Sequence, residues 1–175
     1  HDGYRRLGVI HRRSVSLAPE GDCVIDDTIL PSFTPLPSPL SSVSARLHWL
    51  LPDWAYNVID RHDVLHHHDV LHRQRMQASQ DQEFMLALES PYGPVTLSIA
   101  VDQDGLNQVE IQIVRAGELV YSLGLGHGPG PSLSPTTPVW GWSSPRYGDK
   151  IPALSVSVSI SGKLPLAFSS RFIFP

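Results

Sequence analysis

Residues 154–160 decide the fold, and they read Leu-Ser-Val-Ser-Val-Ser-Ile. Apolar residues occupy every second position, and serines fill the positions between them. Because successive side chains of a β-strand point to opposite faces of a sheet, this alternation predicts a strand with one face on a core and one polar face. Such a strand is typical of an antiparallel sheet that is covered on one side.

The same alternation recurs along most of the chain. Turn-forming residues separate the runs, and Ser-Pro-Tyr-Gly-Pro at residues 90–94 predicts a hairpin. Residues 61–80 are the only candidate helix. We therefore predict an all-β fold, a two-sheet antiparallel β-sandwich of about nine strands. The other predicted strands are Val9–Leu17, Cys23–Ile29, Val43–Leu51, Phe84–Glu89, Val95–Val101, Val109–Val114, Leu119–Tyr121 and Leu164–Phe174.

Composition and charge exclude several classes of protein. The chain has 175 residues, 41% of them hydrophobic and 17% charged, as in a globular domain. Its formal net charge of −4 argues against nucleic-acid binding, and no apolar stretch is long enough to span a bilayer. Cys23 is the single cysteine, so an internal disulfide is excluded. We expect neither a nucleic-acid partner nor a membrane partner.

The domain organisation is expected to be simple. Residues 1–175 are predicted to form one β-sandwich domain, a fragment of a longer parent, because residues 1–6 are neither a start methionine nor a signal peptide. Two segments interrupt the strand pattern. They are a His-rich loop insertion at 61–80 and a Gly/Pro-rich loop at 124–138.

The His-rich insertion contains a tandem repeat, in which His-Asp-Val-Leu-His-His is followed by His-Asp-Val-Leu-His-Arg at residues 62–73. On a helix, histidines four positions apart would share a face, which is the spacing of two imidazoles on one metal ion. The candidate ligands are His62, His66, His68 and His72. A tolerated insertion in a surface loop is the simpler interpretation, because a metal site also needs a third ligand and groups that orient the ligands. We expect no metal.

Two further segments carry residues suited to saccharide chemistry. Near the C-terminus, Trp140, Trp142 and Tyr147 can stack on sugar rings, and Arg146 can pair with acidic sugars. The alternative is a loop that packs its aromatic side chains against its own sandwich or a neighbouring domain.

The N-terminal strand carries the weak catalytic candidates. Tyr4 and His11 are residue types that abstract protons, and Arg13 is a candidate for substrate binding. The alternative is a strand with a solvated polar face, which the pattern alone favours. Serine hydrolase chemistry is not supported, because the chain has no Gly-x-Ser-x-Gly motif.

Several of these motifs occur together in one known family. The motif H-D-G-Y at residues 1–4 leads into H-R-R at 11–13 and D-C-V-I-D-D at 22–27. L-H-W-L follows at 47–50, and W-S-S-P-R-Y-G stands at 142–148. In their order and spacing these elements resemble the late part of heparinase II/III-like polysaccharide lyases. Residues 55–138 are generic β-sequence apart from the His-rich insertion.

The resemblance implies the C-terminal β-sandwich of a bacterial lyase. Such enzymes pair this sandwich with an N-terminal α/α toroid, and they cleave uronic-acid-containing polysaccharides by β-elimination. The family's catalytic His and Tyr and its zinc ligands lie upstream of H-D-G-Y, so no catalytic or zinc residue is carried over. The implied partners are an acidic polysaccharide and the parent's toroid domain, with no cofactor in this chain and a periplasmic or secreted location. The chain would be inactive alone; the alternative is a non-catalytic carbohydrate-binding or interaction module.

Overall fold

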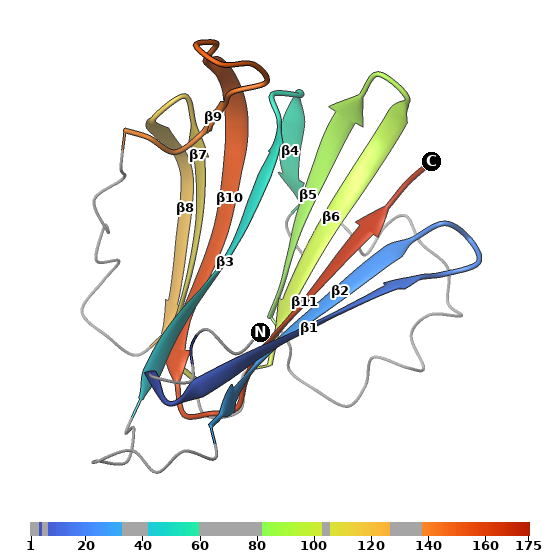
Figure 1. The fold of residues 1–175 in the computed structure, drawn as a ribbon. Coiled ribbons are helices and arrows are strands. Elements are labelled where there is room, and N and C mark those ends of the chain that lie inside the picture. The colour runs from blue at the N-terminus through green and yellow to red at the C-terminus, as the bar shows by residue number, and fades with distance from the viewer. Residues whose placement is uncertain (1–3, 5–6, 33–41, 60–81, 103–105, 127–137) are drawn as a thin grey trace. The chain divides into compact units, whose positions relative to one another are not determined.

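The computed structural model describes residues 4, 7–32, 42–59, 82–102, 106–126 and 138–175. Almost all of these residues form strands or the turns between them (Figure 1). The strands are β1 (Val9–Leu17), β2 (Cys23–Pro31), β3 (Val43–Pro52), β4 (Tyr56–Ile59), β5 (Gln82–Ser90), β6 (Gly93–Val101), β7 (Leu106–Arg115), β8 (Glu118–Gly126), β9 (Trp142–Ser143), β10 (Ile151–Gly162) and β11 (Leu166–Ile173).

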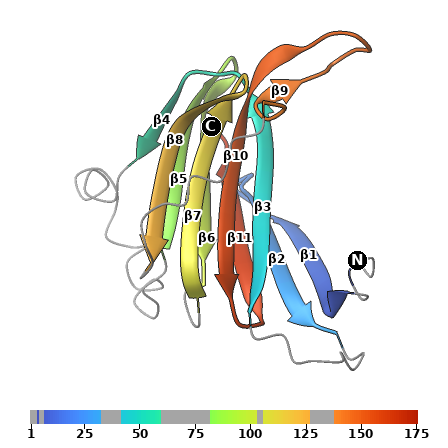
Figure 2. The same ribbon diagram turned by 90° about the vertical axis from the view of Figure 1, so that its left-hand side faces the viewer.

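The strands form two antiparallel sheets. One sheet has six strands in the order β1-β2-β11-β6-β5-β4. The other has five strands, with the order β3-β10-β7-β8 and with β9 paired to one end of β10. Figure 2 shows β10 running between β3 and β7. The predicted fold class, an all-β two-sheet antiparallel sandwich, is confirmed.

The chain divides into two compact units, each built mainly on one sheet. The five-stranded sheet buries the apolar side chains of the segment 154–160, as the sequence predicts. Leu154, Val156, Val158 and Ile160 are each exposed by 2% or less. Their partners on β7 include Ile111, opposite Val158. Burial of one such side chain stabilises the fold by about 1.5–3 kcal/mol.

The six-stranded sheet owes its core to one hairpin. Strands β5 and β6 pair in register, so that Leu86 lies opposite Leu97 and both side chains are completely buried. The turn between them closes at Ser90 and Gly93, as expected from the sequence, and the Ser90 hydroxyl donates to the Gly93 carbonyl oxygen at 2.6 Å. The hairpin prediction is therefore confirmed.

The sequence analysis missed two short strands. Strand β4 has four residues and β9 has two, and neither is long enough to show an alternating pattern. Strand β8 also continues to Gly126, into the first residues of the segment expected to be a loop. Backbone pairing with β7 holds Gly124 in the sheet although it has no side chain to pack. The candidate helix at 61–80 lies outside the described residues.

Candidate functional site

The polar face of β10 differs from its prediction. Alternation predicted a solvated face, but Ser155 and Ser157 are exposed by only 0% and 2%. Ser157 lies between His48 of β3 and Gln112 of β7, which are longer side chains on the two neighbouring strands. Because β10 is a central strand, its serines form a row that is flanked on both sides by side chains of β3 and β7. We call this row, Ser155, Ser157, Ser159 and Ser161, together with the flanking side chains, the trough.

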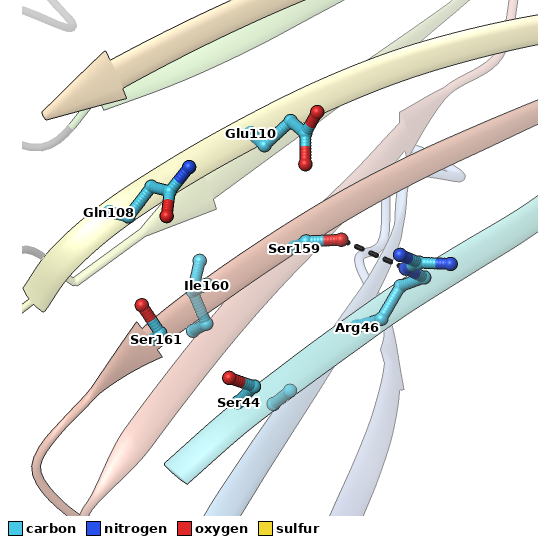
Figure 3. A pocket seen from close by; sticks show the side chains of 8 residues that line it. Ser44, Arg46, Gln108, Glu110, Ser159, Ile160 and Ser161 are labelled. Atoms are coloured by element: carbon cyan, nitrogen blue, oxygen red, sulfur yellow. Dashed lines mark hydrogen bonds between the residues drawn. The ribbon is translucent and has the colours of Figure 1, made fainter. Parts of the chain in front are cut away.

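One end of the trough is open. A cavity of about 490 Å³ lies there, lined by both neighbouring strands as well as by β10. Figure 3 shows Arg46 of β3 and Glu110 of β7 on opposite sides of Ser159. We call this cavity the open end of the trough; the side chains that line it include Ser44, Arg46, Gln108, Glu110, Ser159 and Ser161.

An aromatic residue packs against the β3 side of the trough. The Trp140 ring stacks on the His48 ring with centroids 6.1 Å apart, and the Arg46 guanidinium carbon lies 4.8 Å from the Trp140 centroid. The His48 Nε2 atom shares a hydrogen bond of 2.6 Å with the Ser155 hydroxyl. Burial, and then the positive charge of Arg46, lower the pKa of His48 below its ordinary value. The imidazole therefore favours its neutral form at neutral pH.

Backbone contacts position Trp140. The carbonyl oxygen of Gly141 accepts from the N–H groups of Ala116 at 2.8 Å and Ala153 at 2.9 Å, and the Trp140 carbonyl oxygen accepts from Gly117. Gly141 has φ +74°, and an added Cβ would lie 2.6 Å from the Ala116 nitrogen. Only glycine fits this approach between the β7–β8 turn and the start of β10.

The wall residues are held by their own hydrogen bonds. The Nε of Arg46 donates to the Ser159 hydroxyl at 2.9 Å. On the opposite wall, the Gln112 amide donates to the Glu110 carboxylate at 2.9 Å, and both side chains are buried. The open end thus combines a cation, a carboxylate, an amide and three hydroxyls. Such a mixed set of donors and acceptors can exchange hydrogen bonds with a polar molecule, whereas an apolar molecule would leave these groups without partners.

The predicted aromatic residues do not gather into one platform. Trp140 belongs to the trough, whereas Trp142 lies under the Lys150 ammonium, 4.1 Å from the ring centroid. The Trp142 Nε1 atom is buried and has no hydrogen-bond partner in the part of the chain that the structure describes. Arg146 is exposed, and Tyr147 is fully exposed on the turn that follows. Saccharide binding by these last three side chains stays a prediction.

Two residues predicted on the N-terminal strand meet at a buried carboxylate. Arg13 donates two hydrogen bonds of 2.8 Å to Asp27, and His11 Nε2 lies 2.6 Å from the Asp27 Oδ1 atom. Burial would raise the pKa of Asp27, but the hydrogen bonds from Arg13 and His11 outweigh it and lower that pKa. The same contact raises the pKa of Arg13. This cluster joins β1 to β2, and a carboxylate that orients an imidazole is also the arrangement of a general base.

The structure says little about the function of the remaining predicted residues. Tyr4 is 48% exposed. The candidate metal ligands His62, His66, His68 and His72 lie outside the described residues. Among the residues that are described, no group of three or more His, Cys, Asp or Glu could hold a metal ion, and no helix could cross a membrane.

Comparisons with known proteins leave the geometry as the main guide to function. No family model, curated protein or solved structure matches the chain.

Sequence reasoning missed both walls of the open end. Arg46 and Glu110 are 64 positions apart in the chain and become neighbours of one serine only through the register of three strands. Each stands at a polar position of its alternating strand. These polar positions would have been enough to place both side chains beside the serines if the strand order had been known.

Proposed function

We propose that this chain binds an acidic polysaccharide and does not cleave it. In this proposal it is the C-terminal β-sandwich of a polysaccharide lyase that acts by β-elimination on uronic-acid-containing chains. The observation that carries the binding role is the cavity at the open end of the trough, with hydroxyls on its floor, a guanidinium on one wall and a carboxylate on the other. The lyase context is supported by the sequence resemblance and is consistent with a two-sheet all-β fold.

The chemistry of the trough suits a sugar for three reasons. Hydroxyls and amides can exchange hydrogen bonds with ring hydroxyls in either direction. The planar guanidinium of Arg46 matches the geometry of a carboxylate, which neutral sugars lack and uronic acids carry. The apolar face of a sugar ring can stack on an aromatic side chain, and the part-buried Trp140 lies against Arg46 of the cavity wall.

Cleavage is assigned to the parent's toroid domain. β-Elimination requires a base within hydrogen-bond reach of the C5 proton, in a cleft that excludes water. In the trough the titratable imidazole is His48, whose Nε2 is bonded to Ser155 and whose ring lies against Trp140. A sugar at the open end would meet Arg46 and Glu110 instead.

The test measures binding and cleavage side by side. Isothermal calorimetry of the 175-residue chain with polyglucuronate, alginate and heparan sulfate should give binding to at least one acidic polymer and none to neutral dextran. Arg46→Gln should weaken this binding about tenfold, as expected for loss of a hydrogen bond between charged groups. Arg12→Gln, on the exposed face of β1, is the matched control and should have no effect.

The ultraviolet absorbance of unsaturated products reports cleavage in the same samples. We expect none from the chain and release by the full-length parent. No heat with any acidic polymer would refute the binding role. Product formation by the chain alone would refute the non-catalytic role, and His11, with its carboxylate partner Asp27, would then be the first base to mutate.

Binding without any elimination by the parent would instead favour the second candidate, a carbohydrate-binding module that serves no lyase. The trough supports both candidates equally, because it bears on binding and not on cleavage. Only the parent's activity separates them.

A further inference from the structure

The two walls of the open end carry opposite charges that face the same floor residue. Arg46 of β3 and Glu110 of β7 both lie opposite Ser159 in the strand register. Neighbouring strands are about 4.8 Å apart, so two strand spacings separate the backbones of β3 and β7 by about 9.6 Å. Figure 3 shows these two side chains on opposite sides of Ser159, and both line the cavity.

Both charged groups are held in place before any ligand arrives. Arg46 is held by its hydrogen bond to Ser159 and by the face of Trp140. Glu110 is only 7% exposed and accepts a hydrogen bond from Gln112, which is 2% exposed. A ligand would therefore lose little affinity to the ordering of these side chains.

The buried carboxylate limits what can bind. An ionised carboxylate only accepts hydrogen bonds, so it needs a donor such as a sugar hydroxyl. A sulfate ester offers no donor, and its negative charge would lie beside that of Glu110 in a partly buried place, where like charges repel strongly. Arg46 across the floor attracts one anionic group, and Glu110 rejects a second.

We propose that the open end of the trough is a subsite for one unsulfated uronate residue. The uronate carboxylate pairs with Arg46, and ring hydroxyls on the opposite side of the sugar donate to Glu110. Hydroxyls of Ser159 and Ser161 bond the ring from below. This inference rests on the proposed binding role, and it narrows the ligand from acidic polysaccharides in general to uronans with little or no sulfate.

The test compares three tetrasaccharides by calorimetry: an oligoglucuronate, the same oligosaccharide with its carboxyl groups reduced to alcohols, and a sulfated heparin fragment. We expect the oligoglucuronate to bind about tenfold or more tightly than either of the others. Arg46→Gln should remove the advantage over the reduced sugar. Glu110→Gln, which keeps the side-chain shape, should tighten heparin binding several-fold and weaken oligoglucuronate binding.

Three outcomes decide between the proposals. If the chain binds acidic sugars but neither variant changes the ranking, the subsite assignment is wrong and the binding role stands. If the unmodified chain binds heparin most tightly, the subsite assignment is also wrong. If no acidic polymer or tetrasaccharide binds, the binding role itself is refuted.

A second measurement covers the case in which Glu110→Gln fails to fold, which thermal unfolding of the variant would reveal. Titration of the unmodified, isotope-labelled chain with oligoglucuronate should shift the NMR signals of the Arg46 Nε–H and the Trp140 indole. The indole signal of Trp54, which follows the opposite end of β3 and has no part in the proposed subsite, should stay unchanged. An equal shift at Trp54 would overturn the assignment.

Discussion

Replacing Gly141 by alanine should dislodge Trp140 and destabilise the five-stranded sheet. Gly141 has φ +74°, a conformation that costs a residue with a Cβ roughly 1–2 kcal/mol. The new Cβ would also lie 2.6 Å from the Ala116 nitrogen and 2.7 Å from the Val114 oxygen. These are backbone atoms of a paired strand and its turn, so the segment that carries residue 141 must move instead.

The magnitude follows from the hydrogen bonds that this movement would break. The Gly141 carbonyl oxygen accepts two backbone hydrogen bonds, from Ala116 and Ala153. Each contributes about 0.5–1.5 kcal/mol. With the conformational cost, the free energy of unfolding should fall by about 2–5 kcal/mol. Displacement of Trp140 from Arg46 and His48 should weaken oligoglucuronate binding as well.

Gly148→Ala is the matched control for this prediction. Gly148 has φ +87° but nothing within 4 Å of an added Cβ, so it should lose only the conformational term. Urea denaturation followed by circular dichroism gives both free energies of unfolding. A loss in Gly141→Ala no larger than that in Gly148→Ala would refute the steric reasoning, and unchanged sugar binding would refute the role assigned to Trp140.

Two further predictions concern charged groups. Asp27→Asn should lower the free energy of unfolding by about 1–2 kcal/mol near neutral pH, a value reduced for the solvent exposure of Arg13. The folded pKa of Asp27 lies below the ordinary 3.8, so the stability that its carboxylate contributes is complete above that pH and is lost as the pH falls through the folded pKa. The difference in free energy of unfolding between the unmodified chain and Asp27→Asn, measured by urea denaturation, should therefore shrink in acid. His48 has a folded pKa below the ordinary 6.5, so the unfolded chain binds more protons and stability falls with decreasing pH. The stability advantage of the unmodified chain over His48→Gln should therefore shrink between about pH 7 and pH 5, and an advantage that grows in acid would contradict the assigned direction.

The strands that the sequence predicted well share one property. Residues 154–160 and the β5–β6 hairpin each bury an unbroken row of apolar side chains on one face, so their alternation is visible without a structure, although the serines of β10 are largely buried as well. Strand β9 has only two residues, too few for such a pattern, and is defined by its pairing with Ile151 and Pro152. The predicted cluster of aromatic residues illustrates the same limit. Sequence proximity suggested that Trp140 and Trp142 act together, but each stacks against a different cation.

The amino-acid sequence by itself determined the all-β class, most strand positions, the main hairpin and which face of β10 carries the apolar core residues. These features depend on side-chain periodicity and turn chemistry, which are local. Only the tertiary structure decided which strands are neighbours and in which register. That register places Arg46 and Glu110 on either side of Ser159 and brings Arg13 and His11 to Asp27. The physical reason is that hydrogen bonds between strands join positions far apart in the chain, and no local pattern specifies the partner.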